Sequence, residues 1–215
     1  MKCMETEMGQ EFHITPQPGD ALILIDVQHD FLPGGALAVP DGDQILPAVE
    51  ALADLFDQVI LTQDWHPAGH SSFASSHPGR SPFEQVAMPY GDQVLWPDHC
   101  VQGTRGAALA LPERVRNKAR LILFKGTRPG IDSYSAFREN DRATRTGLAG
   151  YLRGLGVTRV VLAGLATDYC VGFSALDARQ AGFDVVLVEA ACRGIAPESI
   201  AERRAEMEQA GVLLV

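Results

Sequence analysis

The sequence is poor in the residues that mark several classes of protein. Only three of its 18 cationic residues are lysines (Lys2, Lys118 and Lys125), and the formal net charge is −9. Nucleic-acid binding needs clustered Lys and Arg to neutralise phosphates, so this balance argues against a nucleic-acid partner. No apolar run is longer than a few residues, and the N-terminus is polar. We therefore expect neither a membrane span nor a secretion signal.

Cysteine is also scarce. The four cysteines form no CxxC pair, and their spacing matches neither a zinc finger nor a small disulfide framework. A chain of 215 residues can bury a sufficient core without cross-links. We therefore expect reduced thiols and a cytoplasmic protein. Cys3 lies in a polar tail, and Cys192 is expected to be structural.

The remaining composition is that of an ordinary globular protein. Hydrophobic residues make up 46% and charged residues 21% of the chain, which excludes a disordered or fibrous protein. No linker, repeat or low-complexity tract interrupts the sequence. The prediction is one domain over residues 1–215, with a polar N-terminal extension over residues 1–19.

Short apolar runs alternate with amphipathic stretches along the chain. The runs are rich in β-branched residues and continuous rather than alternating, which is typical of strands buried on both faces of a parallel sheet. They cover residues 21–25, 59–61, 121–124, 160–163, 185–188 and 212–215. Helices are predicted over residues 45–56, 144–155, 171–181 and 197–210. The alternation predicts a three-layer α/β/α sandwich around a parallel sheet of about six strands.

Two segments have neither pattern, residues 67–105 and 126–142. Both are rich in Gly, Pro, Ser and His. Long irregular loops in a compact domain usually carry function.

Reactive side chains follow four of the predicted strands. Asp26 follows the first, Asp64 the second and Lys125 the third, and the fourth leads into the turn that carries Cys170. Because ligands of open α/β sheets bind beyond the carboxyl ends of the strands, we expect these four residues to meet at one edge.

Cys170 is the candidate nucleophile. A helix that begins near Thr167 or Asp168 would place it in the first turn, where the thiolate is favoured. Lys125 would lower the thiol pKa further, and Asp26 would accept the proton. The alternatives are a buried structural cysteine, a lysine that extends to solvent and an aspartate that caps a loop.

Four of the six histidines lie between residues 66 and 99. Asp64, His66, His70 and His99 form a set that suits Zn, Mn or Fe, and Cys100 is expected beside it. The alternative is a group of solvated loop histidines.

The same loops contain Phe31, Trp65, Trp96 and Tyr134. Aromatic residues are most often core residues. Here, both tryptophans lie beside metal-type residues, which favours a pocket for a flat ring.

Several motifs together resemble the bacterial nicotinamidases of the isochorismatase-like hydrolase superfamily, from about residue 20 to the C-terminus. The sequence departs from that pattern at His29, where the family usually has Asn. The motifs are Asp26-Val27-Gln28-His29-Asp30-Phe31, Gly34-Gly35-Ala36-Leu37, Asp64-Trp65-His66-Pro67, Trp96-Pro97-Asp98-His99-Cys100-Val101, Lys125-Gly126-Thr127, Asp132-Ser133-Tyr134-Ser135-Ala136-Phe137 and Gly164-Leu165-Ala166-Thr167-Asp168-Tyr169-Cys170-Val171.

The resemblance implies a hydrolase that converts nicotinamide and water to nicotinate and ammonia in NAD salvage, and that also accepts pyrazinamide. It implies a catalytic triad of Asp26, Lys125 and Cys170. The N–H groups of Ala166 and Cys170 would hold the oxyanion, and the Leu165–Ala166 peptide bond would be cis.

The resemblance also implies one divalent metal ion, zinc before manganese or iron. Its ligands would be Asp64, His66 and His99. Some family members have a fourth ligand at or near His70, but we expect His70 to bind the water of the metal instead. The substrate contacts would come from Phe31, Trp96, Tyr134 and Leu165.

Three other functions fit parts of the pattern. An isochorismatase needs no cysteine, and family enzymes that hydrolyse carbamoyl compounds keep the triad without this metal set. A catalytically idle metal-binding or redox-sensing module would not need Asp26 or Lys125. The oligomeric state stays open between a monomer and a homodimer.

Overall fold

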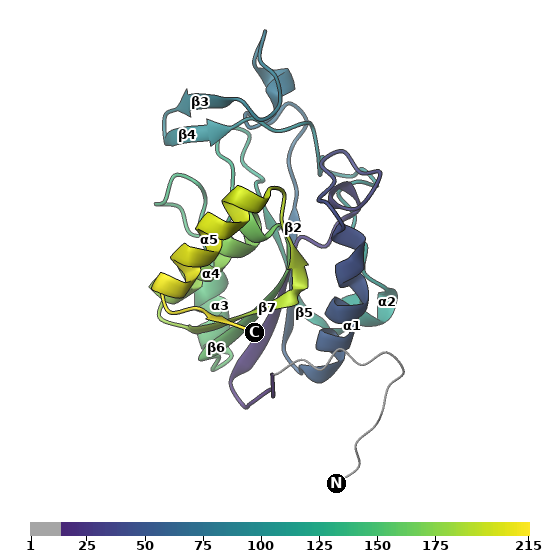
Figure 1. Cartoon of the computed structure of the whole chain (residues 1–215), viewed down its shortest axis with the longest axis vertical. Helices are drawn as coiled ribbons and strands as arrows, with labels where there is room; N and C mark the ends of the chain where they lie inside the picture. Colours follow the sequence, from purple (N-terminus) through teal and green to yellow (C-terminus); the bar gives the residue numbers. More distant parts are fainter. Residues whose placement is uncertain (1–13) are drawn as a thin grey trace.

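A six-stranded sheet forms the centre of the molecule (Figure 1). The structure is a computed structural model that describes residues 14–215, so Cys3 and most of the predicted extension lie outside the described residues. Every neighbouring pair of strands is parallel, in the order β5-β2-β1-β6-β7-β8. The strands are β1 (Asp20–Ile25), β2 (Val59–Asp64), β5 (Ala119–Lys125), β6 (Arg159–Leu165), β7 (Asp184–Arg193) and β8 (Leu213–Leu214). The predicted fold class is confirmed.

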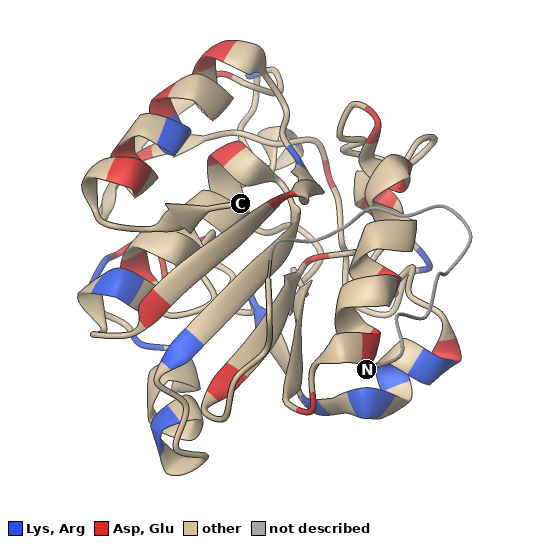
Figure 2. Ribbon diagram, turned by 60° about the horizontal axis from the view of Figure 1, so that its bottom comes forward, with Lys and Arg blue, Asp and Glu red and all other residues tan. Residues whose placement is uncertain are grey.

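Helices cover both faces of this sheet (Figure 1). One face carries α1 (Leu46–Leu55) and α2 (Glu113–Lys118), and the other carries α3 (Leu148–Gly154), α4 (Gly172–Gln180) and α5 (Pro197–Gln209). In β1, Leu22 and Leu24 belong to one core, and Ile23 and Ile25 belong to the other. Successive side chains of a strand point to opposite faces, so a strand covered on both sides is a continuous apolar run. Figure 2 shows charged residues mainly on helices, loops and strand ends.

Three of the predicted helices agree with α1, α4 and α5 to within one residue at each end. The helix predicted over residues 144–155 begins only at Leu148, because Gly147 has a left-handed φ of 94° and Arg145 pairs with Arg138 in an antiparallel bridge. Helix α2 and the hairpin of β3 (Gln85–Met88) and β4 (Gly91–Val94) were not predicted. Each is too short to show a clear hydrophobic period. Among residues 14–215, no helix is long and apolar enough to cross a bilayer.

Strand β5 departs from the prediction that every strand is buried on both faces. Ile122 is 40% and Phe124 48% exposed, whereas Leu121 and Leu123 pack against the core. The reason is that β5 lies at the edge of the sheet. The ring of Trp65 stacks on Phe124, with 4.8 Å between the ring centres.

The order in which strands are added to the sheet reverses between β1 and β6. From β1, the next strand along the chain lies on one side, and from β6 it lies on the other. In sheets of this kind, the crevice beyond the carboxyl ends at the reversal point is the usual ligand site. The loops after β1, β2, β5 and β6 all reach this region.

Gly164 allows β6 to lie close to β1. It has a φ of 126°, and a Cβ atom there would lie 2.1 Å from the carbonyl oxygen of Ile25. We expect Gly164→Ala to lower the free energy of unfolding by about 2–4 kcal/mol, because backbone cannot yield as a flexible side chain can. The control is Gly150→Ala in α3, where a Cβ would meet nothing within 4 Å and where about 0.5–1 kcal/mol should be gained. Guanidinium denaturation measures both, and equal stabilities would contradict the tight approach of the strands.

Candidate active site

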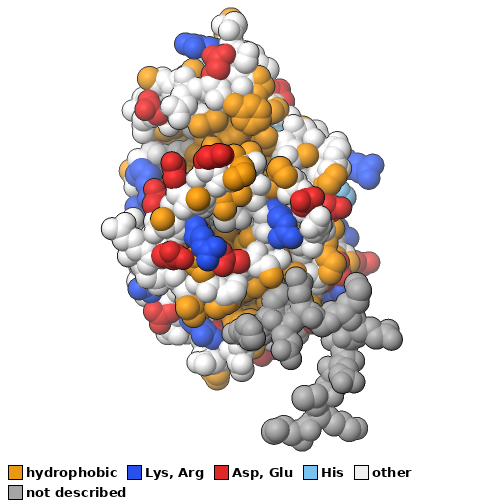
Figure 3. Space-filling view, in the orientation of Figure 1, with side chains coloured by type: hydrophobic (Ala, Val, Ile, Leu, Met, Phe, Trp, Pro, Cys, Tyr) orange, Lys and Arg blue, Asp and Glu red, His pale blue; other side chains and the backbone are white. Residues whose placement is uncertain are grey.

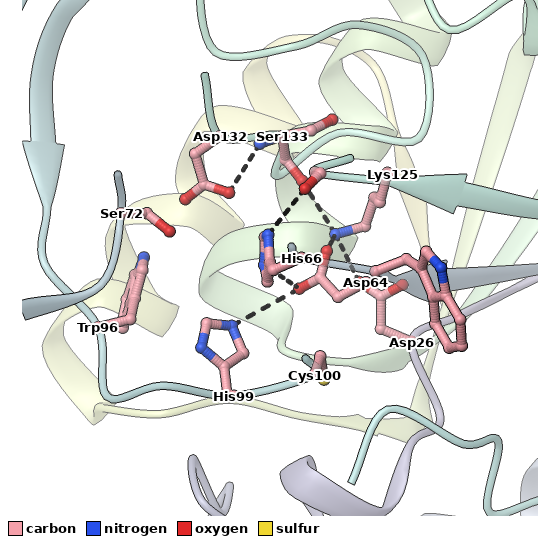
Figure 4. Close-up of polar contacts among 12 residues, drawn as sticks. Asp26, Asp64, His66, Ser72, Trp96, His99, Cys100, Lys125, Asp132 and Ser133 are labelled. Atoms are coloured by element: carbon pink, nitrogen blue, oxygen red, sulfur yellow. Dashed lines mark hydrogen bonds and ion pairs between the residues drawn. The ribbon is translucent and has the colours of Figure 1, made fainter. Parts of the chain in front are cut away.

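Lys125, the last residue of β5, is the centre of a buried polar cluster (Figure 4). Its Nζ lies 2.8 Å from Oδ2 of Asp26 and contacts Oδ1 of Asp64. It donates to the carbonyl of Ser133 at 3.0 Å and to Sγ of Cys170 at 3.3 Å. Burial by itself would lower the pKa of Lys125, but the two carboxylates hold that pKa well above its usual value. The ammonium is therefore charged in the folded protein.

The order of the strands brings this cluster together. Lys125 and Asp64 are register partners at the ends of β5 and β2. Asp26 directly follows β1, and Cys170 lies shortly after β6. These four strands are consecutive in the sheet. The structure thus brings together all four residues that the sequence placed at strand ends.

Asp26 is held by the neighbouring strand. Its backbone has a left-handed φ of 48°, and its N–H donates to Oγ1 of Thr62 at 3.1 Å. The Thr62 hydroxyl donates in turn to Oδ1 of Asp26 at 2.6 Å, which leaves Oδ2 to face Lys125. Burial raises the pKa of Asp26 above its usual value, although Lys125 opposes the shift. A buried carboxylate with a raised pKa is suited to accept a proton.

The thiol of Cys170 agrees with the prediction in its position but not in its pKa. A helical segment begins at Thr167, as predicted, and Cys170 lies in its first turn; this segment (Thr167–Val171) is π-helical and precedes α4. The pKa of the thiol is raised well above the usual value, chiefly by burial and also by Asp26 and Asp64, while Lys125 opposes the shift. The prediction of a thiolate-favouring site is therefore wrong for the resting protein. The thiol is protonated and needs a proton acceptor before it can attack.

Asp64 also faces two histidines (Figure 4). Its Oδ2 lies 3.7 Å from Nε2 of His66 and 3.8 Å from Nε2 of His99. The Nδ1–H of His66 donates to the Gly126 carbonyl at 3.0 Å, and that of His99 donates to the Pro97 carbonyl at 2.8 Å. Because each Nδ1–H bonds a carbonyl, Nε2 is the nitrogen that each ring turns toward Asp64 and the one that could bind a metal when it is unprotonated.

This donor set suits a divalent cation. The three ligand atoms lie within 4.8 Å of one another, and all three residues are buried. Two carboxylates and one ammonium leave the buried cluster with a negative charge that a cation would balance. Gly126 is required here, because a Cβ would lie 2.4 Å from Cε1 of His66.

His70 lies apart from the Asp64 oxygens. Its Nδ1 accepts from the Ser72 hydroxyl at 2.7 Å, and its Nε2–H donates to the Arg128 carbonyl at 2.8 Å. Among residues 14–215, the one candidate metal-binding set that includes His70 is His66, His70 and Asp132, whose ligand atoms lie within 4.8 Å of one another. With both nitrogens engaged, His70 ties its loop to the Arg128 loop. Its predicted bond to a metal-bound water stays a prediction.

A pocket opens above this cluster. Phe31, Trp96 and Tyr134 line it as predicted, together with Leu37, Asp64, His99, Asp132, Ala166, Tyr169, Cys170 and Ile195. Leu165 is not among these residues, because its side chain packs in the core. The expectation for Trp65 is wrong, since its ring packs on Phe124 instead.

Aromatic rings form one wall of the pocket. The indole N–H of Trp96 donates to the Tyr134 hydroxyl at 3.2 Å, and the Tyr169 ring meets Trp96 edge-on at 4.8 Å. Phe31 lies near His99, with 5.6 Å between ring centres. Hydrophobic side chains also gather in Figure 3 between the lobe with the β3–β4 hairpin and the helices below it. Such a wall suits a flat, apolar ring.

Three other expectations about this region can be compared with the structure. The Leu165–Ala166 peptide bond is cis, as the resemblance implies. Cys192 is buried, and burial raises its pKa to about 12, so it is an inert thiol. Cys100 is the predicted neighbour of the histidines, since its carbonyl accepts from the His66 N–H at 3.0 Å.

Sequence reasoning missed several residues that hold the site. The side-chain amide of Gln28 makes two hydrogen bonds to the backbone of Asp64: it accepts from the N–H and donates to the carbonyl, each at 2.8 Å. Gln93 of β4 donates to Asp132 and to the Tyr134 hydroxyl, each at 2.9 Å. Gln28 could have been noticed as a polar residue two positions after Asp26. Gln93 carries no such signal, because its contacts depend on an unpredicted hairpin.

The sequence is similar to that of proteins of known function. Residues 20–215 match the family described as the isochorismatase domain. A curated nicotinamidase of Acinetobacter baylyi is 52% identical over 179 residues, which is 81% of each chain.

Two solved structures are similar over nearly the whole chain. A nicotinamidase and pyrazinamidase of Acinetobacter baumanii has a TM-score of 0.90 and 48% identity, over 93% of this chain and 97% of the other. A pyrazinamidase of Pyrococcus horikoshii in complex with zinc has a TM-score of 0.74 and 40% identity, over 92% and 99%.

The charges around Cys170 predict opposite effects for two substitutions. Lys125→Met removes the cation and should raise the thiol pKa, and each added pKa unit slows alkylation roughly tenfold at a given pH. Asp26→Asn removes a negative charge and should lower that pKa. The measurement is the rate of iodoacetamide alkylation of Cys170 against pH, by mass spectrometry on metal-free protein. Lys118→Met is the matched control, and a rate profile shared by all the variants would exclude the charge arrangement described above.

Proposed function

The chain belongs to the isochorismatase domain family and is a hydrolase of an amide bond, and we propose that it converts nicotinamide and water to nicotinate and ammonia. Cys170 is the nucleophile, Asp26 the proton carrier and Lys125 the supporting cation. One zinc ion, or manganese or iron in its place, is bound by Asp64, His66 and His99.

One observation carries this proposal. The Cys170 thiol, the Asp26 carboxylate and the Lys125 ammonium lie together beneath a pocket walled by aromatic rings. An amide hydrolase needs a nucleophile, a base for its proton and a donor for the leaving amine. The carboxylate can serve as both base and donor, because it lies close to the thiol.

The first half of the reaction forms a thioester. Asp26 takes the proton of the Cys170 thiol, and Sγ attacks the carboxamide carbon. The N–H groups of Ala166 and Cys170 hold the oxyanion, a contribution of about 10²–10³ in rate per donor. Asp26 then gives its proton to the leaving nitrogen, the C–N bond breaks and ammonia departs. Lys125 remains charged throughout and offsets the negative charge that moves between the carboxylate and the sulfur.

The second half regenerates the enzyme. Asp26 takes a proton from a water molecule, and the oxygen attacks the thioester carbon while the same N–H groups hold the oxyanion. The C–S bond breaks and nicotinic acid forms, which loses its proton to solvent and departs as nicotinate, while the proton on Asp26 returns to the Cys170 sulfur.

The ring of the substrate is oriented by the walls of the pocket. Phe31 and Trp96 pack against its faces, Tyr134 closes one side and the backbone at Leu165 lies beneath the reacting group. A metal ion held by Asp64, His66 and His99 would supply an open position, directly or through its waters, for the pyridine nitrogen. His70 keeps the loop beside these ligands in place.

The biological setting follows from the substrate. Nicotinate is a precursor for NAD synthesis, so the enzyme serves NAD salvage, and the similar ring of pyrazinamide makes it a second substrate. Cys100, Cys170 and Cys192 are free, in keeping with a reducing cytoplasm. Residues 20–215, which match the family, act as one catalytic domain.

The direct test is ammonia release from nicotinamide by metal-loaded and metal-stripped protein. We expect release that depends on the metal. Release only from a carbamoyl compound would favour the related hydrolases, and no release from either substrate would favour an idle metal-binding module.

Cys170→Ala should lower the rate of ammonia release by about 10⁴-fold or more, since it removes the sulfur that forms the thioester. Cys192→Ala is the matched control and should keep most of the activity, because that thiol lies in β7 and is inert. The two variants should have similar melting temperatures. Ammonia release by Cys170→Ala at the rate of the unmodified enzyme would exclude a thioester.

His66→Ala and His99→Ala should lose bound metal, because each removes one of three ligands. His70→Ala should keep the metal, since both of its ring nitrogens bind protein groups. Atomic emission on the purified proteins gives the metal content. Metal-free His70→Ala protein would make His70 a ligand and would show that a three-ligand site is wrong.

A further inference from the structure

A second pocket, away from the active site, is lined by arginines. It has a volume of about 150 Å³ and lies between the segment that precedes α3 and the end of α4. Arg138, Arg145 and Arg153 line it, and Asp177 is the one carboxylate among its described lining residues. This excess of positive charge contrasts with the net charge of −9 of the whole chain.

The single carboxylate is already engaged. Asp177 is fully buried and accepts from both terminal nitrogens of Arg142, at 3.1 and 2.5 Å. Arg138 reaches the same carboxylate only at 3.5 Å. Among the described residues, no carboxylate lies within 4 Å of the guanidinium groups of Arg145 or Arg153. Two of the three lining arginines therefore have no acidic partner.

The backbone brings like charges together. Arg138 and Arg145 face each other in an antiparallel bridge, and like charges at directly opposed positions are destabilising. Nothing in the hydrophobic packing requires arginine at either position, because both side chains lie at least partly in solvent. An anion between the two would convert the repulsion into attraction.

The rest of the pocket is already in place for such an anion. The Arg153 guanidinium donates to the Ala181 carbonyl and lies 5.4 Å from the centre of the Phe183 ring. The floor includes Phe137, which is buried, and Ala149. A guanidinium held in this way loses little freedom on binding, and its N–H groups match the oxygens of a phosphate.

We propose that this pocket binds the phosphoryl group of a small molecule, either free phosphate or a phosphomonoester. The volume limits the size of the group that fits inside, because this pocket is smaller than most small-molecule sites, which are usually about 300–1,000 Å³. A space of about 150 Å³ holds one phosphoryl group, and any attached nucleoside would extend into solvent. Arg138, Arg145 and Arg153 bind its oxygens.

The test is calorimetric titration of the full-length, metal-free protein at low salt with inorganic phosphate and, separately, with AMP. The test variant is Arg145→Gln with Arg153→Gln, which removes two of the binding cations. The control variant is Arg80→Gln with Arg204→Gln, which changes the net charge equally at exposed residues elsewhere. Adenosine shows any contribution of the nucleoside alone.

We expect the unmodified protein and the control variant to bind at least one of the two anions with similar affinity. Binding to the test variant should be at least tenfold weaker, because charge-assisted hydrogen bonds are lost. Tighter binding of phosphate would identify the free ion, and tighter binding of AMP would identify a phosphomonoester. Absence of binding at millimolar concentrations, or equal affinity of the two variants, would overturn the proposal.

Discussion

The pairing of one buried ammonium with two carboxylates is the interaction on which the rest of the site depends. Lys125 is 2% exposed, and a charge at that depth is tolerated only when it is paired. Asp26 and Asp64 provide the pairing from the two strands that follow β5 across the sheet. Loss of the ammonium would leave two buried carboxylates without the cation that they share, so the arrangement of the strands and the charge state of the site are inseparable.

Asp64 connects the two halves of the site. One of its oxygens contacts Lys125 and the other faces His66 and His99. Its pKa is held well below the usual value, since Lys125 and His66 outweigh the effect of burial. The group remains a carboxylate, which is the form that both an ammonium and a metal ion require. The Lys125 ammonium and the donor set that suits a metal thus share the side chain of Asp64.

The thiol illustrates how burial and charge compete. A neighbouring cation and a helical turn both favour a thiolate, and the sequence contains both features. Burial and two nearby carboxylates act in the opposite direction and prevail, so the pKa of Cys170 is raised. A thiol with a raised pKa needs a proton acceptor before it can act as a nucleophile, and the Asp26 carboxylate lies in the same buried group.

The sequence by itself determined the class of fold, because apolar runs that alternate with amphipathic stretches can be buried only as a parallel sheet between helices. It also predicted that Asp26, Asp64, Lys125 and Cys170 lie together, because side chains that follow parallel strands meet at one edge of the sheet. The tertiary structure decided the order of the strands, and with it which residues touch, since Lys125 and Asp64 are 61 residues apart in the chain. It likewise decided the exposure of Phe124, the place of Trp65 outside the pocket and the pKa of Cys170. Each of these depends on long-range burial, which no local pattern of residues records.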